Sequence, residues 1–162
     1  MPEGSRIEKL EHEVAALRAM VARLSDVEEI RSLIGGYGPA VDRGDSMAAA
    51  GLWADDGVYD LGELGSRSGH EAIAALLDGA MHQELIHGGA AHLLGPPRID
   101  LDGDEATAVC HSCVIRWTGD VFELFRVAAN RWALRRTPLG WRVTERTNRL
   151  LTGSADARAL FA

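Results

Sequence analysis

Two residues of the chain have side chains suited to moving a proton. His92 carries an imidazole, which titrates near neutral pH, and Asp42 carries a carboxylate that can hold an imidazole in one orientation. Removing a proton from a carbon atom beside a carbonyl group needs such a base, shielded from bulk water. Both residues also have simpler interpretations, since His92 could cap a loop and Asp42 could cap the turn before Arg43 and Gly44. Their spacing alone leaves both interpretations open.

Three more polar residues could serve a substrate site. Tyr37, five residues before Asp42, is either a proton donor or a core residue. Arg146 could stabilise a developing negative charge, although an arginine beside Glu145 at a strand end is often only solvated. Asn130 could hold a carbonyl oxygen or satisfy a bulge. The flat apolar walls of a site for a cyclic or aromatic ligand, or an ordinary core, would come from Trp53, Trp117 and Trp132.

The remaining cysteine and histidine patterns do not favour metal or redox chemistry. Cys110 and Cys113 are three residues apart in a strand-like stretch, so their side chains would face opposite sides of a sheet. His82, His87 and His92 are separated by five residues each, unlike the short ligand spacings of zinc sites. We therefore expect free thiols, no metal ion and no cofactor.

Composition excludes several other classes of function. The chain has 162 residues and a formal net charge of −7, which disfavours nucleic acid as a partner. It has no apolar stretch long enough for a membrane span, and its first residues lack the order of a signal peptide, so we expect a cytoplasmic protein that does not bind membranes. It also has no phosphate-binding P-loop and no GxSxG elbow, which disfavours nucleotide hydrolysis and serine-esterase chemistry.

The first 25 residues have the pattern of a heptad helix. Apolar residues recur at alternating spacings of three and four, and charged residues fill half of the positions between them. Such a stripe must be covered by a partner helix or by the chain's own domain, and we expect a homodimer or homotrimer. The apolar positions are Ile7, Leu10, Val14, Leu17, Val21 and Leu24.

The rest of the chain is typical of an α+β domain. Residues 26–37 and the stretches on either side of Gly44 read as helices, with a bend expected at Gly35, Gly36 and Pro39. Residues 57–61 read as a strand and 70–81 as an amphipathic helix. Four further strand-like stretches follow, divided by turn signals, at 98–102, 105–118, 121–136 and 141–151.

Helices followed by a long meander predict a curved antiparallel sheet wrapped over the N-terminal helices. The expected fold is a cone-shaped α+β barrel, with a small-molecule pocket at its hollow end. The expected division is a heptad helix at 1–25, the cone domain at 26–152 and a C-terminal tail at 153–162, either loose or closed by a short helix.

Several motifs along residues 27–151 resemble the SnoaL-like family of the nuclear-transport-factor-2-like fold. The order and spacing of the motifs, more than any single one, carry this resemblance. They are Tyr37-Gly-Pro-Ala-Val-Asp42-Arg-Gly-Asp45, Leu52-Trp53-Ala-Asp55, Gly69-His-Glu-Ala-Ile73, His92-Leu-Leu-Gly95, Ile99-Asp-Leu-Asp-Gly103-Asp104 and Gly140-Trp141-Arg142-Val143 before Arg146.

Within that family the chain is similar to the small lyases: scytalone dehydratase, bile-acid 7α-dehydratase and hexachlorocyclohexane dehydrochlorinase. The resemblance implies that His92 is the base and that Asp42 orients it. Tyr37 would then bind or protonate the leaving oxygen, while Arg146 and Asn130 match pocket residues of the dehydrochlorinase and of scytalone dehydratase.

The chain also departs from these relatives. The water-binding tyrosine pair of scytalone dehydratase falls here on Val41 and Leu61, and its second histidine falls on Trp117, which disfavours scytalone as the substrate.

The resulting expectation is a cofactor-independent lyase that acts on a small cyclic or aromatic hydrophobic molecule. An isomerase or a polyketide-type cyclase would use nearly the same groups. A noncatalytic small-molecule-binding module and an oxygenase partner subunit are alternatives of a different class, because one fold can host many functions.

Overall fold

In the computed structural model, which describes residues 3–162, the chain begins with one long helix, α1 (Glu3–Asp42). The predicted bend at Gly35, Gly36 and Pro39 is wrong, because α1 continues through all three residues. A proline ring presses on the carbonyl group four residues earlier, which here belongs to Gly35, an exposed residue with open space around its Cα. Burial of the inner face of the helix then outweighs the weak helical propensity of these residues.

Short helices and seven strands follow α1. Four of these elements were not predicted from the sequence, namely the 3₁₀ helix η1, the strands β2 and β3, and the helix α4. In chain order the elements are α2 (Ser46–Ala50), β1 (Trp53–Asp60), η1 (Gly62–Leu64), β2 (Ser66–Ser68), α3 (His70–Leu77), α4 (Ala80–His87), β3 (Ala90–Leu94), β4 (Arg98–Asp102), β5 (Glu105–Trp117), β6 (Phe122–Thr137), β7 (Gly140–Leu150) and α5 (Ala155–Ala159).

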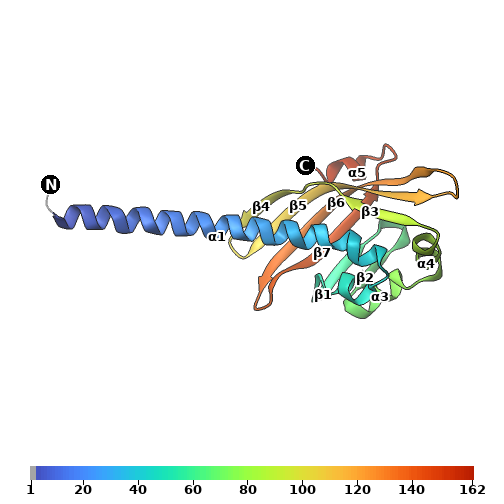
Figure 1. Cartoon of the computed structure of the whole chain (residues 1–162), viewed down its shortest axis with the longest axis horizontal. Coiled ribbons are helices and arrows are strands. Elements are labelled where there is room, and N and C mark those ends of the chain that lie inside the picture. Colours follow the sequence, from blue (N-terminus) through green and yellow to red (C-terminus); the bar gives the residue numbers. More distant parts are fainter. Residues whose placement is uncertain (1–2) are drawn as a thin grey trace.

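The seven strands form one curved, unclosed sheet (Figure 1). Its order is β2-β1-β7-β6-β5-β3. The N-terminal part of β5 pairs with β4, and its C-terminal part pairs with β3. The long meander β5-β6-β7 is antiparallel, as predicted, whereas β1 pairs with β7 in parallel. The expected α+β class is therefore confirmed. The C-terminal segment contains the short helix α5, which lies against β6 and β7.

The core lies between the sheet and the C-terminal half of α1, which crosses the sheet in Figure 1. Ile30, Ile34, Tyr37 and Val41 recur at helical spacing along α1, and all four side chains are buried. They pack against strand residues that include three fully buried tryptophans, namely Trp53, Trp132 and Trp141.

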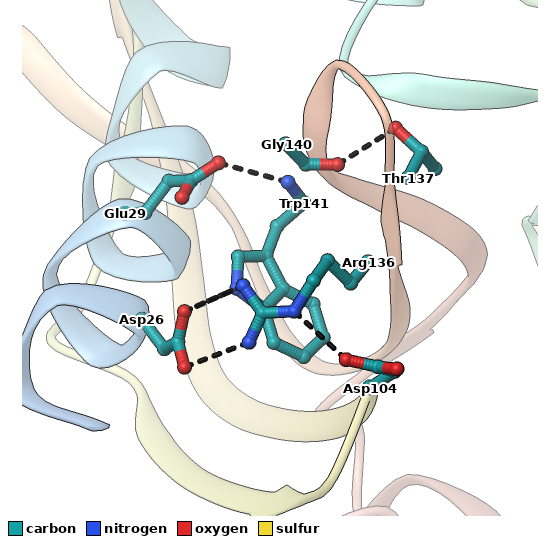
Figure 2. Close-up of polar contacts among 7 residues, drawn as sticks. All are labelled: Asp26, Glu29, Asp104, Arg136, Thr137, Gly140 and Trp141. Atoms are coloured by element: carbon teal, nitrogen blue, oxygen red, sulfur yellow. Dashed lines mark hydrogen bonds and ion pairs between the residues drawn. The ribbon is translucent and has the colours of Figure 1, made fainter. Parts of the chain in front are cut away.

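Polar contacts fasten α1 to the β6-β7 turn, as Figure 2 shows. Both carboxylate oxygens of Asp26 accept hydrogen bonds from the guanidinium group of Arg136, at 2.7 and 2.8 Å, and one of them also accepts from the indole Nε1 of Trp141 at 3.2 Å. Glu29 accepts the backbone N–H of Trp141 at 2.8 Å. Because a Cβ at Gly140 would overlap this Glu29 carboxylate, and Gly140 has a φ of +91°, the turn requires glycine at that position.

The N-terminal half of α1 projects beyond the sheet (Figure 1). The predicted boundary between residues 25 and 26 falls inside this continuous helix. Among residues 3–162, no helix is long and apolar enough to cross a membrane.

Candidate active site

Asp42 and His92 meet where the C-terminal end of α1 crosses β3. Nδ1 of His92 lies 2.7 Å from Oδ1 of Asp42, and the same carboxylate accepts the backbone N–H of His92 at 3.0 and 3.2 Å. The His92 side chain is 11% exposed and that of Asp42 is 27% exposed. Gly38 makes the contact possible, because a Cβ at this position would overlap the carbonyl oxygen of His92. The close approach of α1 to β3 at Gly38 thus brings Asp42 and His92 into contact.

The contact with Asp42 determines which nitrogen of His92 can act as a base. A carboxylate only accepts hydrogen bonds, so Nδ1 carries the proton and Nε2 keeps its lone pair. Burial lowers the pKa of His92, and this effect exceeds the opposing effect of the Asp42 carboxylate. His92 is therefore a neutral imidazole at neutral pH, held in one tautomer by Asp42.

His82, on α4, places a second imidazole beside the first. The ring centroids of His82 and His92 are 5.4 Å apart. Nδ1 of His82 lies 2.7 Å from the carbonyl oxygen of Leu77, which can only accept, so Nδ1 of His82 is the donor in this contact. This Nε2 is buried and has no hydrogen-bond partner among the described residues. His82 and His92 are ten residues apart in the sequence, and the packing of α4 against β3 brings their rings together.

Arg126 approaches the same site from β6. Val114 of β5 pairs with both His92 and Arg126, so the three residues form one row on the same face of the sheet. Nε of Arg126 is buried without a partner, and no ion pair involves this residue in the part of the chain that the structure describes. Its charge helps to lower the pKa of His92. Arg126 lies four residues before Asn130 on a predicted strand, so the two side chains share one face of the sheet. This spacing is the one sequence signal that could have identified Arg126.

Arg146 forms a second buried charged group, among aromatic side chains. Its side chain is 2% exposed, and its guanidinium carbon lies 4.2 Å from the ring centroid of Tyr37, 4.3 Å from that of Trp132 and 4.7 Å from that of Tyr59. Within residues 3–162 no carboxylate pairs with it, and its Nη1 is buried without a hydrogen-bond partner. A buried cation without a counter-ion is costly and suits a site that receives negative charge.

Asn130 holds Arg146 through its amide oxygen. This Oδ1 accepts Nε and Nη2 of Arg146 at 3.0 and 2.8 Å and Nδ2 of Asn148 at 2.9 Å. The amide nitrogen of Asn130 donates to the Ser112 hydroxyl at 2.8 Å. Asn130 is fully buried, so its hydrogen-bonding groups serve to orient Arg146.

Tyr37, Trp53 and Trp132 lie together as a wall of the core. Tyr37 makes edge contacts with both tryptophans, at centroid distances of 6.0 and 6.2 Å. Burial raises the pKa of the Tyr37 hydroxyl, so it stays protonated and able to donate. Trp117, by contrast, lies near the tip of the β5-β6 hairpin, is 40% exposed and packs on Phe122. The structure thus groups five of the eight predicted residues around Arg146 or near it, joins two others as the His92–Asp42 pair and leaves Trp117 apart.

Two open surface grooves lie elsewhere. One of about 380 Å³ follows the N-terminal half of α1 from Ile7 to Arg18, and another of about 420 Å³ lies between α1 and Trp141. Neither groove is lined by His92 or Asp42.

The two cysteines are separate free thiols. Cys110 is buried and pairs with Asn130 of β6. Cys113 is half-buried and pairs with Val127 of β6 and Leu93 of β3. Burial raises the pKa of the Cys110 thiol, which makes it a poor nucleophile. Among the described residues, no group of three or more His, Cys, Asp or Glu side chains could hold a metal ion.

Comparison with known proteins gives a family and a set of structural relatives. The model of the SnoaL-like domain matches residues 22–147. A crystal structure of a nuclear-transport-factor-2-like protein with a cystatin-like fold, from Novosphingobium aromaticivorans, is 50% identical. The match covers 90% of this chain and 95% of the relative, with a TM-score of 0.89. No protein with a curated description gives a significant match.

More distant structures share the fold. A candidate aromatic ring hydroxylase from Novosphingobium aromaticivorans is 24% identical, with a TM-score of 0.62 over 83% of this chain and 96% of the relative. The ActVI-ORFA protein of Streptomyces coelicolor is 18% identical, with a TM-score of 0.69 over 78% and 96% of the two chains.

Proposed function

The chain belongs to the family of SnoaL-like domains, and from this premise and its paired side chains we propose that it is a cofactor-independent, dehydratase-like lyase. The observation that carries the proposal is the 2.7 Å contact between Nδ1 of His92 and Oδ1 of Asp42. The substrate class is a small cyclic or aromatic hydrophobic molecule, which agrees with the aromatic chemistry in the name of one structural relative. A cytoplasmic location remains part of the proposal.

The first step is removal of a carbon-bound proton by Nε2 of His92. Burial keeps the imidazole neutral, and the Asp42 carboxylate stabilises the imidazolium that forms when the proton arrives. In the elimination, the electron pair of the broken C–H bond forms a new double bond as a hydroxide or other leaving group departs. The proton on His92 can then be returned to that leaving group as water forms.

The second requirement is stabilisation of the negative charge that develops on a substrate oxygen. Arg146 is suited to this role because its Nη1 has no protein partner and its charge has no counter-ion among the described residues. Fixed charges in a site from which water is excluded are worth more than the same charges in water. The protonated hydroxyl of Tyr37, whose ring packs against the guanidinium group of Arg146, is proposed to assist the leaving group.

An isomerase or cyclase is the second candidate, favoured by the same base. His82 adds a second imidazole beside His92, with a buried Nε2 that has no partner among the described residues, and two imidazoles would suit moving a proton between positions of one molecule. Product mass separates the candidates, since elimination of water or another group lowers the mass and isomerisation leaves it unchanged.

The test is exchange of carbon-bound hydrogen in heavy water, using a panel of small cyclic hydroxyketones and phenolic ketones with mass-spectrometric detection. We expect the wild-type chain to catalyse exchange with at least one compound, and His92→Gln to reduce the rate about 10²- to 10⁴-fold. His87→Gln is the matched control, because His87 is an exposed histidine at the end of α4. Binding of panel compounds without any exchange would instead support a noncatalytic binding module.

A further inference from the structure

The N-terminal half of α1 carries an apolar stripe that its own domain does not cover. The six side chains are 44 to 62% exposed, although they are all of types normally found in cores. The first three of them, Ile7, Leu10 and Val14, also line the groove on this half of the helix. The residues, defined here as the seam, are Ile7, Leu10, Val14, Leu17, Val21 and Leu24.

The seam faces away from the domain that the same helix joins. At about 3.6 residues per turn, the seam lies roughly 160° around the helix from the buried positions Ile30, Ile34, Tyr37 and Val41. A second helix could therefore lie along the seam without displacing any contact between α1 and the sheet. The two attached domains would lie on the outer sides of the pair.

The types of residue along the seam select one kind of partner. Ile7, Val14 and Val21 occupy the first apolar position of each heptad, and they are all β-branched. The second apolar position holds leucine in every heptad, at Leu10 and Leu17 and again at Leu24. Because β-branched residues at the first position with leucine at the second favour two parallel strands, we propose that the seam pairs with a second copy of this chain as a parallel, in-register coiled coil.

Charges beside the seam agree with this arrangement. In a parallel pair, the residue just before each first apolar position faces the residue five places later on the other helix. Arg6 would then face Glu11 of the second copy, and Glu13 would face Arg18, each pair occurring twice by symmetry. All four residues are exposed. Among the described residues of one chain, the only ion pair that involves any of them is that of Glu13 with Lys9 at 3.9 Å, which is solvated.

The alternative orientation leaves half of these charges unmatched. In an antiparallel pair with the seams fully overlapped, Glu13 would lie opposite Met20, and Arg6 would lie opposite Val27. The parallel pair thus satisfies every charged residue beside the seam, and charge complementarity of this kind sets orientation.

The seam also ends where the domain begins. The next two heptad positions hold Glu28 and Arg31, which pair with each other at 3.3 Å on one helix and are exposed. Charged residues there would not form an apolar layer, so the pairing stops after Leu24. The coiled coil is roughly 27 Å long, and the two domains diverge from its end.

Sedimentation equilibrium of the full chain tests the proposal over a wide range of concentration. We expect a mass of two chains, and Val14→Glu with Leu17→Glu should halve it. The matched control is Ala16→Glu with Ala19→Glu, which adds the same charges to the opposite side of the same helix turns and should leave two chains. A wild-type mass of one or three chains, or a variant that remains a dimer, would overturn the proposal. Circular dichroism confirms that each variant is folded.

Cross-linking tests the orientation. In a Cys113→Ser parent, Leu10→Cys should form a disulfide between two copies under mild oxidation, since residue 10 lies opposite itself only in a parallel, in-register pair; Cys110 is buried and does not compete. Ala16→Cys, on the outer side, should remain largely uncoupled. Efficient coupling between a Leu10→Cys chain and a Val21→Cys chain, with none between two Leu10→Cys chains, would show the antiparallel arrangement and contradict the proposal.

Discussion

Gly38 of α1 packs directly against the backbone carbonyl group of His92, and this contact sets the distance between the helix and β3. Gly38→Ala would force a Cβ into the carbonyl oxygen. The backbone of β3 cannot move without disturbing its pairing with β5, so we expect a loss of about 1 to 3 kcal/mol of unfolding free energy, together with a loosened His92–Asp42 contact. Urea denaturation measures the first effect.

Gly36→Ala is the matched control for this substitution. It lies in the same helix, but a Cβ at residue 36 meets nothing within 4 Å. Because alanine is the better helix former, this variant should gain up to about 1 kcal/mol. Equal effects of the two substitutions would show that helical propensity, and not the contact with His92, governs this segment.

The tautomer of His92 can be tested by changing one atom of its partner. In Asp42→Asn, the amide nitrogen can donate to Nδ1, which would move the proton of the imidazole to Nε2 and remove the lone pair that the proposed base needs. We expect exchange activity to fall, but no further than in His92→Gln, which removes the base itself. The ¹⁵N chemical shifts of the His92 ring report the tautomer directly. Unchanged shifts with full activity would contradict the assignment of Nε2 as the base.

The lowered pKa of His92 also predicts how stability and activity depend on pH. In the folded chain His92 gives up its proton more readily than in the unfolded chain, so its contribution to stability is present above the ordinary value of 6.5 and is lost as the pH falls through the folded value. The acid limb of kcat/KM should therefore lie below pH 6.5. His92→Gln should remove part of the acid destabilisation that the wild type shows between neutral pH and the folded pKa.

Arg126→Gln tests one cause of that shift. Burial, the largest cause, would remain, as would Asp42 and His82, but the repulsion between the guanidinium and the imidazolium would be lost. NMR titration should show the pKa of His92 moving up towards its ordinary value. An unchanged titration curve would mean that the row formed by His92, Val114 and Arg126 does not bring the two charges close enough to interact.

Some of the fold was predictable because local signals and tertiary packing agree. The β5-β6-β7 meander has long alternating stretches and clear turn residues, and its predicted bounds lie within about two residues of those observed. The continuous α1 was not predictable from Gly35, Gly36 and Pro39, because the buried face that outweighs their weak propensity is a tertiary property. β3 was missed because Ala90–Leu94 is short and lacks alternation.

The candidate site was predictable only in part for a similar reason. The resemblance to a family indicated Asp42 and His92, which lie 50 residues apart, and the structure brings them into contact. His82 and Arg126 reach the same place through the α4-β3 connection and through the register of β5 with β6. Neither relationship has a signature in sequence spacing, because helix packing and strand register set both distances.

The Arg146→Met substitution should abolish activity while changing the unfolding free energy little. In Arg146→Met, the chain loses a buried cation without a counter-ion, while Asn130 still accepts a hydrogen bond from Asn148. The saved desolvation free energy offsets the lost ring contacts and hydrogen bonds, so we expect the unfolding free energy to stay within about 2 kcal/mol of the wild type while activity is abolished. Arg149→Met is the contrast: it breaks a 2.7 Å pair with the partly buried Asp60, and should lower stability with little effect on turnover.

Asp26 and Asp104 both pair with Arg136, and they should differ sharply in what they contribute to the free energy of unfolding. Asp26 is 19% exposed and also accepts the indole N–H of the buried Trp141, whereas Asp104 is 81% exposed (Figure 2). Asp26→Ala would leave Trp141 with an unsatisfied buried donor and loosen α1 from the β6-β7 turn, so we expect a loss of about 2 to 3 kcal/mol. Asp104→Ala should cost less than about 1 kcal/mol, as solvated ion pairs do.

The pH dependence of the two Asp variants distinguishes this explanation from a general loss of charge. Hydrogen bonding to Arg136 lowers the pKa of Asp26, so its contribution to stability is present above the ordinary value of 3.8 and disappears as the pH falls through the folded value. The difference in unfolding free energy between wild type and Asp26→Ala should therefore shrink in acid, whereas the Asp104→Ala difference stays small throughout. Equal losses from the two substitutions at neutral pH would show that the contact with Trp141 contributes nothing, and that α1 is held by its apolar face alone.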